Sequence, residues 1–263
     1  MPCVTLSPDQ AAMVLRALAT TTTAQAHQSV WSRRSYAPGH IFAPEFATVR
    51  AALEATNPGY TIAFDVVFES RGGETPWHCD YESLGPFVVR NRWRAISDAH
   101  FRTVHFNLTP DGGQLVTLGW PVLSYVCYVV IAHWGIFSLF HTALLCFLRP
   151  VGRLWGTSHA NTPHTGNVFD NTRLHMVTHG APRTSYAVRL VRDHCVRVSP
   201  ASVVRGIRRS AACTAFINLL AVVGEGETDV SAVDWAGLAP PASTPCTPLL
   251  LCPPTGKHAP PGA

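Results

Sequence analysis

A run of 29 uncharged and mostly apolar residues, 120–148, lies in the middle of this 263-residue chain. It belongs to a longer stretch, 112–148, that has no Asp, Glu, Lys or Arg. Because about 20 apolar residues suffice to cross a bilayer, one long helix here could span a membrane. Two helices of about 12 residues with a turn near Gly135 would each be too short to cross. Such a pair would lie at a membrane surface, cap the neighbouring domain or be buried.

The composition of the whole chain is that of a globular protein. Hydrophobic residues make up 47% of it and charged residues 14%, which excludes a disordered acidic or basic chain. The net charge of +4 comes from scattered basic residues, so we expect no nucleic-acid partner. The eight cysteines form no CxxC pair and the N-terminus has no signal-peptide pattern. We therefore predict a cytoplasmic location, with membrane association through 120–148 as an addition to it.

Helices come first along the chain, and strands follow. Ser7 and Gln10 form a capping-box pattern that predicts a helix to about Ala19, and a second helix is predicted from Pro44 to about Ala55. The alternation of apolar and polar residues that is typical of strands follows over 60–70, 101–109, 114–118, 167–169, 174–178 and 184–198. This order predicts an α+β fold with an antiparallel sandwich or barrel at its centre.

The chain divides into a main domain and two appended segments. We expect the main domain over 1–200, with an apolar helical insertion at 119–150. A helical segment is expected over 201–239. Eight of the 21 prolines fall in the last 24 residues, 240–263, a composition that predicts a disordered tail.

One short segment carries residues that could bind a metal ion. His78 and Asp80 follow a predicted strand and a Gly-Gly turn, and such a pair can supply two neighbouring ligands to Fe(II). The pair alone is a weak signal, because a chain of this composition is expected to contain about one by chance. His175, on a returning strand, is the best candidate for a third ligand, and His179 is its rival.

Arg183 and Ser185 could bind a carboxylate. They lie two residues apart on a predicted strand, so their side chains point the same way. An Arg fork beside a hydroxyl suits a carboxylate group. Arg173 and Arg189 are alternative partners for such a group.

Taken in order, these pieces resemble the Fe(II)- and 2-oxoglutarate-dependent oxygenases, in the branch of the prolyl and phytanoyl-type hydroxylases. The resemblance covers roughly 60–192. It rests on His78 and Asp80, the DGGQL segment at 111–115, the GNVFDN segment at 166–171, His175, and Arg183 with Ser185. It implies that the core is a double-stranded β-helix, a distorted jelly roll, with helices before it and an oxygenase domain over 1–200.

The resemblance also implies roles for individual residues. By it, the metal ligands are His78, Asp80 and His175, and the groups that hold the distal carboxylate of 2-oxoglutarate are Arg183 and Ser185. His105 and Asn107, on the polar face of 101–109, would either line the pocket and touch 2-oxoglutarate or face solvent.

The implied reaction uses Fe(II), with 2-oxoglutarate as cosubstrate and O₂, to hydroxylate a C–H bond, and it releases succinate and CO₂; a need for ascorbate is left open. Asp80 favours hydroxylation, because halogenating relatives lack a carboxylate there. Two other classes remain as alternatives. One is a non-catalytic, membrane-associated β-barrel that binds or scaffolds, and the other is a cupin-type metal enzyme that does not use 2-oxoglutarate.

The expected metal site constrains the apolar run. If His78 and His175 bind one ion, they lie on the same side of any membrane, so 120–148 cannot cross it once. We therefore expect a helical hairpin that enters one leaflet, lies on the membrane surface or caps the barrel. A hairpin beside the site predicts an apolar or lipid-like small-molecule substrate, with a protein side chain as the alternative.

Overall fold

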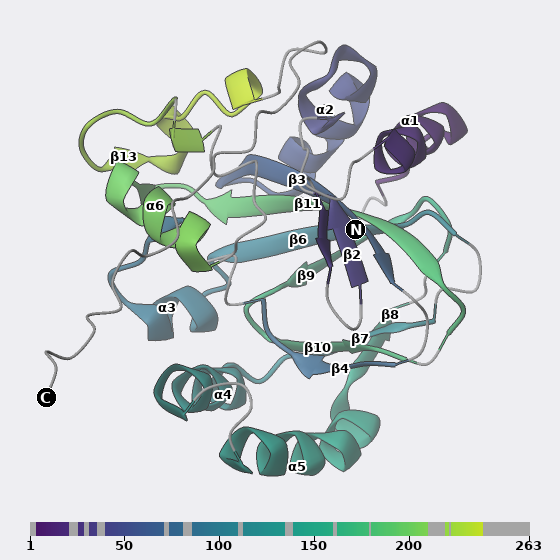
Figure 1. The fold of residues 1–263 in the computed structure, drawn as a ribbon, viewed down its shortest axis with the longest axis vertical. Coiled ribbons are helices and arrows are strands. Elements are labelled where there is room, and N and C mark those ends of the chain that lie inside the picture. Colours follow the sequence, from purple (N-terminus) through teal and green to yellow (C-terminus); the bar gives the residue numbers. More distant parts are fainter. Residues whose placement is uncertain are drawn as a thin grey trace, which may run out of the picture.

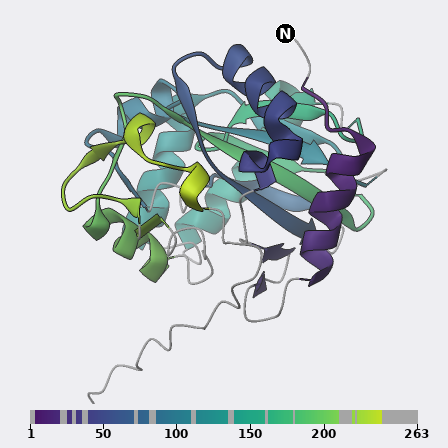
Figure 2. The ribbon, with the colours of Figure 1, turned by 90° about the horizontal axis from the view of Figure 1, so that it is seen from above.

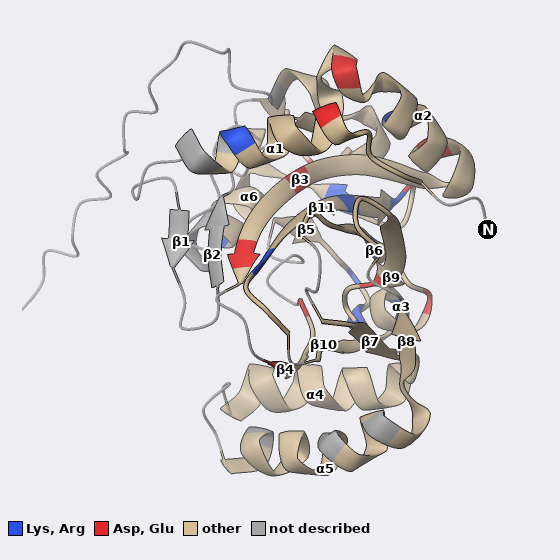
Figure 3. Ribbon diagram, turned by 90° about the vertical axis from the view of Figure 1, so that its right-hand side faces the viewer, with Lys and Arg blue, Asp and Glu red and all other residues tan. Residues whose placement is uncertain are grey.

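Two antiparallel sheets face each other at the centre of this computed structural model, and helices cover the outer side of each (Figures 1 and 3). The structure describes residues 4–20, 26–28, 32–35, 40–70, 74–80, 86–109, 113–134, 139–159, 162–178, 180–209, 219–220 and 222–238. The predicted α+β class with a central antiparallel sandwich is confirmed, and the two facing sheets agree with a jelly roll.

The larger sheet, which we call the major sheet, has six strands. In spatial order they are β1 (Ala26–Gln28), β2 (Ser32–Ser35), β3 (Tyr60–Ser70), β11 (Arg183–Arg192), β6 (Phe101–Asn107) and β9 (Gly166–Asp170). The opposite sheet, the minor sheet, has four: β4 (Thr75–His78), β10 (Leu174–Val177), β7 (Leu115–Leu118) and β8 (Thr157–His159). A third, short sheet joins β13 (Thr228–Asp229), β12 (Arg197–Val198) and β5 (Phe87–Val88).

Two N-terminal helices cover the outer face of the major sheet. They are α1 (Pro8–Thr20) and α2 (Ala47–Thr56), which lie side by side in Figure 2. The capping box is present: Ser7 N–H donates to Gln10 Oε1 at 2.8 Å, and Gln10 N–H donates to Ser7 Oγ at 3.2 Å. The remaining helices are α3 (Arg92–Ser97), α6 (Pro200–Arg209) and the 3₁₀ turns His40–Phe42, Pro44–Phe46, Val230–Ala232 and Ala236–Leu238.

Strands β3, β6 and β11 of the major sheet are largely buried on both faces, which the alternation of their sequence did not indicate. Asp65, expected on a polar face, is only 1% exposed. Its Oδ2 accepts hydrogen bonds from the Tyr186 hydroxyl at 2.6 Å and from the Ile41 N–H at 3.0 Å. These bonds offset the cost of burying the carboxylate, so α2 and the turn before it can pack over this part of the sheet.

The apolar run forms two helices, α4 (Pro121–Trp134) and α5 (Leu139–Trp155), beneath the minor sheet (Figures 1 and 3). Residues 135–138, where the turn was expected, lie outside the described residues. Helix α5 continues to Trp155, past the predicted end of the helical insertion at 150. The interpretation as a fully buried helix pair is wrong, because large apolar side chains stay exposed, Leu139 to 87%.

None of the helices that the structure describes combines the length and the apolar character that crossing a membrane would take.

Helix α5 touches the minor sheet at Gly152. A Cβ atom at this position would lie 1.9 Å from Cζ2 of Trp77, a buried side chain of β4. The close approach therefore requires a residue without a side chain, although glycine is a poor helix former.

We expect Gly152→Ala to lower the free energy of unfolding by about 1–3 kcal/mol, because overpacking against Trp77 outweighs the gain in helix propensity. Urea denaturation measures the effect. Gly119→Ala is the matched control, since a Cβ there meets nothing within 4 Å. Equal stability of the two variants would mean that α5 does not pack on β4 as described.

Three predictions about the second half of the chain need correction or stay open. The strand predicted over 184–198 is broken, because β11 ends at Arg192 and a turn with His194 at φ 61° precedes β12. Of the predicted C-terminal helical segment, α6 covers Pro200–Arg209, and residues 210–218 lie outside the described residues. The Pro-rich tail, 240–263, also lies outside the described residues. The domain boundaries remain predictions.

Candidate metal centre

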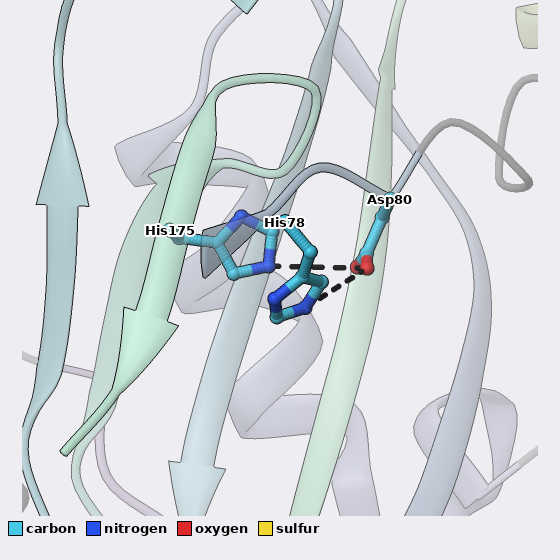
Figure 4. A group of neighbouring side chains, drawn as sticks. All are labelled: His78, Asp80 and His175. Carbon is cyan, nitrogen blue, oxygen red and sulfur yellow. Dashed lines mark ion pairs between the residues drawn. The ribbon is translucent and has the colours of Figure 1, made fainter. Parts of the chain in front are cut away.

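Two histidines face each other across neighbouring strands of the minor sheet. Strands β4 and β10 pair antiparallel with His78 opposite His175, and the centres of the two rings are 4.2 Å apart. Asp80 follows two residues after His78, and its N–H donates to the Asn171 carbonyl at 2.8 Å. This backbone bond holds the carboxylate beside both rings (Figure 4).

Backbone carbonyls fix the orientation of both imidazoles. His78 Nδ1 lies 2.8 Å from the Pro76 carbonyl oxygen, and His175 Nδ1 lies 2.9 Å from that of Arg173. Because a carbonyl only accepts hydrogen bonds, these contacts assign the proton to Nδ1 in each ring. With that proton on Nδ1, the lone pair of each ring that could bind a metal is the one on Nε2.

The donor atoms of the three side chains converge. Asp80 Oδ1 is 3.6 Å from His78 Nε2 and 3.8 Å from His175 Nε2, and all three donor atoms lie within 4.8 Å of one another. These separations are too long for hydrogen bonds. Two donors each about 2.1 Å from one ion lie about 3.0–3.6 Å apart at angles of 90–120°. The group can therefore close on one divalent cation with a small movement.

Burial favours the neutral state of one of these rings. Burial, and then the neighbouring His78, lower the pKa of His175 to about 3, so this ring is neutral at pH 7. Asp80 is also buried, at 8% exposed, whereas the His78 side chain is 32% exposed. The open side of the group is thus at His78. Two histidines and one carboxylate with open positions are the donor set of mononuclear non-haem iron sites.

Arg189 reaches the second oxygen of the carboxylate from the opposite sheet. Its guanidinium nitrogen NH2 lies 2.9 Å from Asp80 Oδ2, and the two side chains are 12% and 10% exposed. The guanidinium also donates to the Thr103 hydroxyl. Arg189 therefore occupies Oδ2 and leaves Oδ1 to face the histidines. It was considered from the sequence only as a partner for a bound carboxylate.

We expect Arg189→Met to lower the free energy of unfolding of the metal-free protein by about 3 kcal/mol, because it removes a guanidinium that pairs with the buried Asp80 carboxylate. Chemical denaturation in the presence of a chelator measures this. Arg192→Met, at the exposed end of the same strand, is the control and should cost far less. Equal losses in the two variants would contradict a stabilising pair.

The other predicted cosubstrate residues lie on the inner face of the major sheet. Arg183 and Ser185 begin β11, are 3% and 0% exposed, and share a face with Arg189. Arg183 reaches across to the minor sheet, where it donates to the Thr75 hydroxyl at 2.9 Å. Burial lowers the pKa of the Arg183 guanidinium below its ordinary value. Arg183 and Arg189 thus bridge the two sheets at Thr75 and Asp80.

His105 and Asn107 lie beside these arginines. They are 5% and 1% exposed, so the alternative that they face solvent is wrong. On β6 they pair with Ala187 and Ser185 of β11. Burial, and then the positive charges of Arg183 and Arg189, lower the pKa of His105 to about 4. A neutral imidazole therefore lies between two cationic groups.

Several buried polar atoms on this inner face are unsatisfied. Among the residues that the structure describes, Ser185 Oγ, Asn107 Oδ1 and His105 Nδ1 make no hydrogen bond. Buried polar atoms normally find a partner, and leaving one unsatisfied costs about 1–3 kcal/mol. Together with the guanidinium groups, they suit a polar, anionic molecule between the sheets.

Two alternatives from the sequence remain: Arg173 as a partner for a bound carboxylate, and His179 as the third metal ligand. Arg173 lies in the turn between β9 and β10, where its Nε is 3.1 Å from Asp170 Oδ2. Its guanidinium also donates hydrogen bonds to the carbonyls of Gly119 at 3.0 Å and Ser97 at 2.9 Å. It is not a free carboxylate partner. His179, the rival ligand, lies outside the described residues.

Solved structures of other proteins are similar to this chain. The chain is similar to an oxidoreductase of the 2OG-Fe(II) oxygenase family from Burkholderia pseudomallei, at 12% identity and a TM-score of 0.42 over 71% of this chain and 80% of that one. It is also similar to EctD from S. alaskensis, solved with 2-oxoglutarate and 5-hydroxyectoine, at 15% identity and a TM-score of 0.41 over 74% of this chain and 71% of that one. A third similar structure is the non-haem α-ketoglutarate-dependent epimerase SnoN from nogalamycin biosynthesis, at 13% identity and a TM-score of 0.44 over 73% of this chain and 76% of that one.

No family model and no curated protein matches the chain. The function proposed below therefore depends on the geometry of this chain's own residues.

Proposed function

We propose that this chain is an Fe(II)- and 2-oxoglutarate-dependent oxygenase that hydroxylates a C–H bond. The observation that carries the proposal is the convergence of His78 Nε2, His175 Nε2 and Asp80 Oδ1 within 4.8 Å. Both histidines have their other nitrogen held by a backbone carbonyl, so the lone pairs that face Asp80 are available to a cation.

The residues fit the iron that this function requires. In the proposal His78, Asp80 and His175 hold Fe(II), which supplies the activation of O₂ for attack on a C–H bond. Arg189 keeps Asp80 in place by binding Oδ2, so that one carboxylate oxygen is offered to the ion. The turn that ends at Arg173 orients His175, because the Arg173 carbonyl holds its Nδ1.

The inner face of β6 and β11 fits the cosubstrate. 2-Oxoglutarate is a dianion, and Arg183 offers a guanidinium fork for its distal carboxylate, with Ser185 beside it. The unsatisfied atoms of Ser185, Asn107 and His105 would gain partners when it binds. Its other end would extend toward the metal ligands, past the neutral ring of His105.

Aromatic side chains around the site favour an apolar substrate. The Phe169 ring lies 4.9 Å from that of His175, and the Phe68 ring lies 5.7 Å from that of His105. We propose an apolar or lipid-like small molecule as the substrate, with a protein side chain as the alternative. Asp80 favours hydroxylation over halogenation, as the resemblance of its motif implies.

The test is an anaerobic titration of the metal-free protein with Fe(II) and then with 2-oxoglutarate, followed by visible absorption. We expect a weak charge-transfer band that appears only when both are present, and slow formation of succinate when O₂ is admitted. Iron binding without the band would support a metal enzyme that does not use 2-oxoglutarate. Folded protein that binds no iron would overturn the proposal in favour of a non-catalytic barrel.

A further inference from the structure

The apolar side chains that stay exposed are concentrated on one pair of helices. Nine of the twelve large hydrophobic side chains that are exposed in the described part of the chain lie between Trp120 and Trp155. Val122 is 63% exposed, Phe140 62% and Leu154 71%. Scattered single apolar residues are normal on a protein surface, but a contiguous group of this kind marks an interaction site.

The exposed residues form stripes along both helices. On α4, Val122, Val126 and Trp134 follow a four-residue spacing, and on α5, Phe140, Phe147 and Leu154 follow a seven-residue spacing. Residues at these spacings share one side of a helix. With about 1.5 Å of rise per residue, the 17 residues of α5 make a face about 25 Å long. We call these two stripes the apolar helix face.

Aromatic pairs join the two helices at both ends. The rings of Trp134 and Phe140 lie 5.0 Å apart, and those of Trp120 and Trp155 lie 5.8 Å apart. All four side chains are more than 40% exposed. Tryptophan combines an apolar ring with a hydrogen-bonding N–H, and it is enriched where hydrocarbon meets water in membranes. The helix pair thus carries exposed aromatic rings at both of its ends.

The charge of this segment distinguishes between possible occupants. From 112 to 169 the chain contains no Asp or Glu, and its only charged residues are Arg149 and Arg153 of α5. Figure 3 shows α4 without a Lys, Arg, Asp or Glu. A second copy of the chain on a two-fold axis would bring the same segment, with arginines and no carboxylate. The head groups of anionic lipids supply the missing negative charge.

We propose that the apolar helix face docks this protein in the plane of a phospholipid bilayer that contains anionic lipid. The exposed side chains enter the outer part of one leaflet, and the positive charge of a segment without carboxylates favours anionic head groups. Helix α5 packs on Trp77 of β4 through Gly152, and His78 is the next residue of that strand. Because successive side chains of a strand point to opposite faces, docking leaves the helix pair and the minor sheet between the bilayer and the candidate metal centre, and it does not depend on the proposed reaction.

Flotation of the metal-free, full-length protein with vesicles tests the proposal. One set is phosphatidylcholine alone, and the other contains about one third phosphatidylserine. We expect wild type to float with the anionic vesicles and to be released by salt in part. The triple variant Leu139→Gln, Phe147→Gln, Leu154→Gln should lose at least about tenfold in vesicle affinity, because three apolar side chains no longer leave water. Leu15→Gln with Leu220→Gln, exposed elsewhere, is the matched control.

Quenching of wild-type tryptophan fluorescence by brominated lipid keeps the test independent of any variant. Docking is supported if brominated lipid quenches the tryptophan fluorescence of wild type but not that of the triple variant. A wild type that neither floats nor is quenched overturns the proposal. A dimer that the triple variant converts to monomer, seen by analytical ultracentrifugation without lipid, overturns it in favour of a second copy. Vesicle binding that appears only after residues 239–263 are removed would overturn the proposal for the full chain. It would mean that this tail is the partner that binds the apolar helix face.

Discussion

His175→Ala is expected to raise the dissociation constant for Fe(II) more than about 100-fold, because loss of a ligand should cost more than loss of a residue that only supports one. The ring is 4% exposed, its Nδ1 is held by the Arg173 carbonyl, and its Nε2 faces Asp80 at 3.8 Å. No other imidazole replaces it in this geometry among the described residues. Anaerobic competition with a chromophoric chelator measures the constant.

Two further variants make this result specific. His159→Ala removes a histidine of β8 in the same sheet, whose Nε2 lies 2.9 Å from the Thr117 hydroxyl, and should leave iron affinity unchanged. His179→Ala tests the rival ligand and should also have no effect. If His175→Ala, folded by circular dichroism, kept its affinity while His179→Ala lost it, the ligand assignment would be wrong.

The regular parts of the fold could be predicted because their sequence patterns are local. The capping box at Ser7 and the alternation over 60–70 depend only on neighbouring residues. Short strands carry too few residues to show a period, so β4, which includes Pro76, and β8 were not predicted as strands. The burial of Asp65 was missed for a related reason, since its partners Ile41 and Tyr186 are distant in the chain.

The three candidate metal ligands, which the structure brings together, could be chosen from the order of the motifs, but the residues that hold them in place could not. The pairing of His78 with His175 follows from the antiparallel register of β4 and β10, which spacing alone does not fix. The contact of Arg189 with Asp80 joins the two sheets. The sequence nevertheless indicated where Arg189 lies. Residues 183, 185, 187 and 189 are two apart on one strand, so their side chains point to the same face. That pattern places Arg189 on the face that carries the predicted clamp.

Arg183→Met is expected to weaken 2-oxoglutarate binding on the order of 100-fold and to leave Fe(II) affinity unchanged. Hydrogen bonds to a charged group contribute about 1.5–3 kcal/mol each, and a guanidinium fork can make two to one carboxylate. The Arg183 guanidinium donates to the hydroxyl of Thr75, three residues before His78 in the chain. Titration of the charge-transfer band with 2-oxoglutarate at saturating iron measures this affinity.

The contrast between Arg183 and Arg189 decides which of them binds the cosubstrate. Arg183→Lys keeps the charge but not the fork, so we expect an affinity between those of wild type and Arg183→Met. Arg189→Met removes the partner of Asp80, so its main effect should be on protein stability. If 2-oxoglutarate affinity survived Arg183→Met but was lost in Arg189→Met with iron still bound, the roles would be reversed. The cosubstrate would then displace Asp80 from Arg189, and Arg183 would only join β11 to β4.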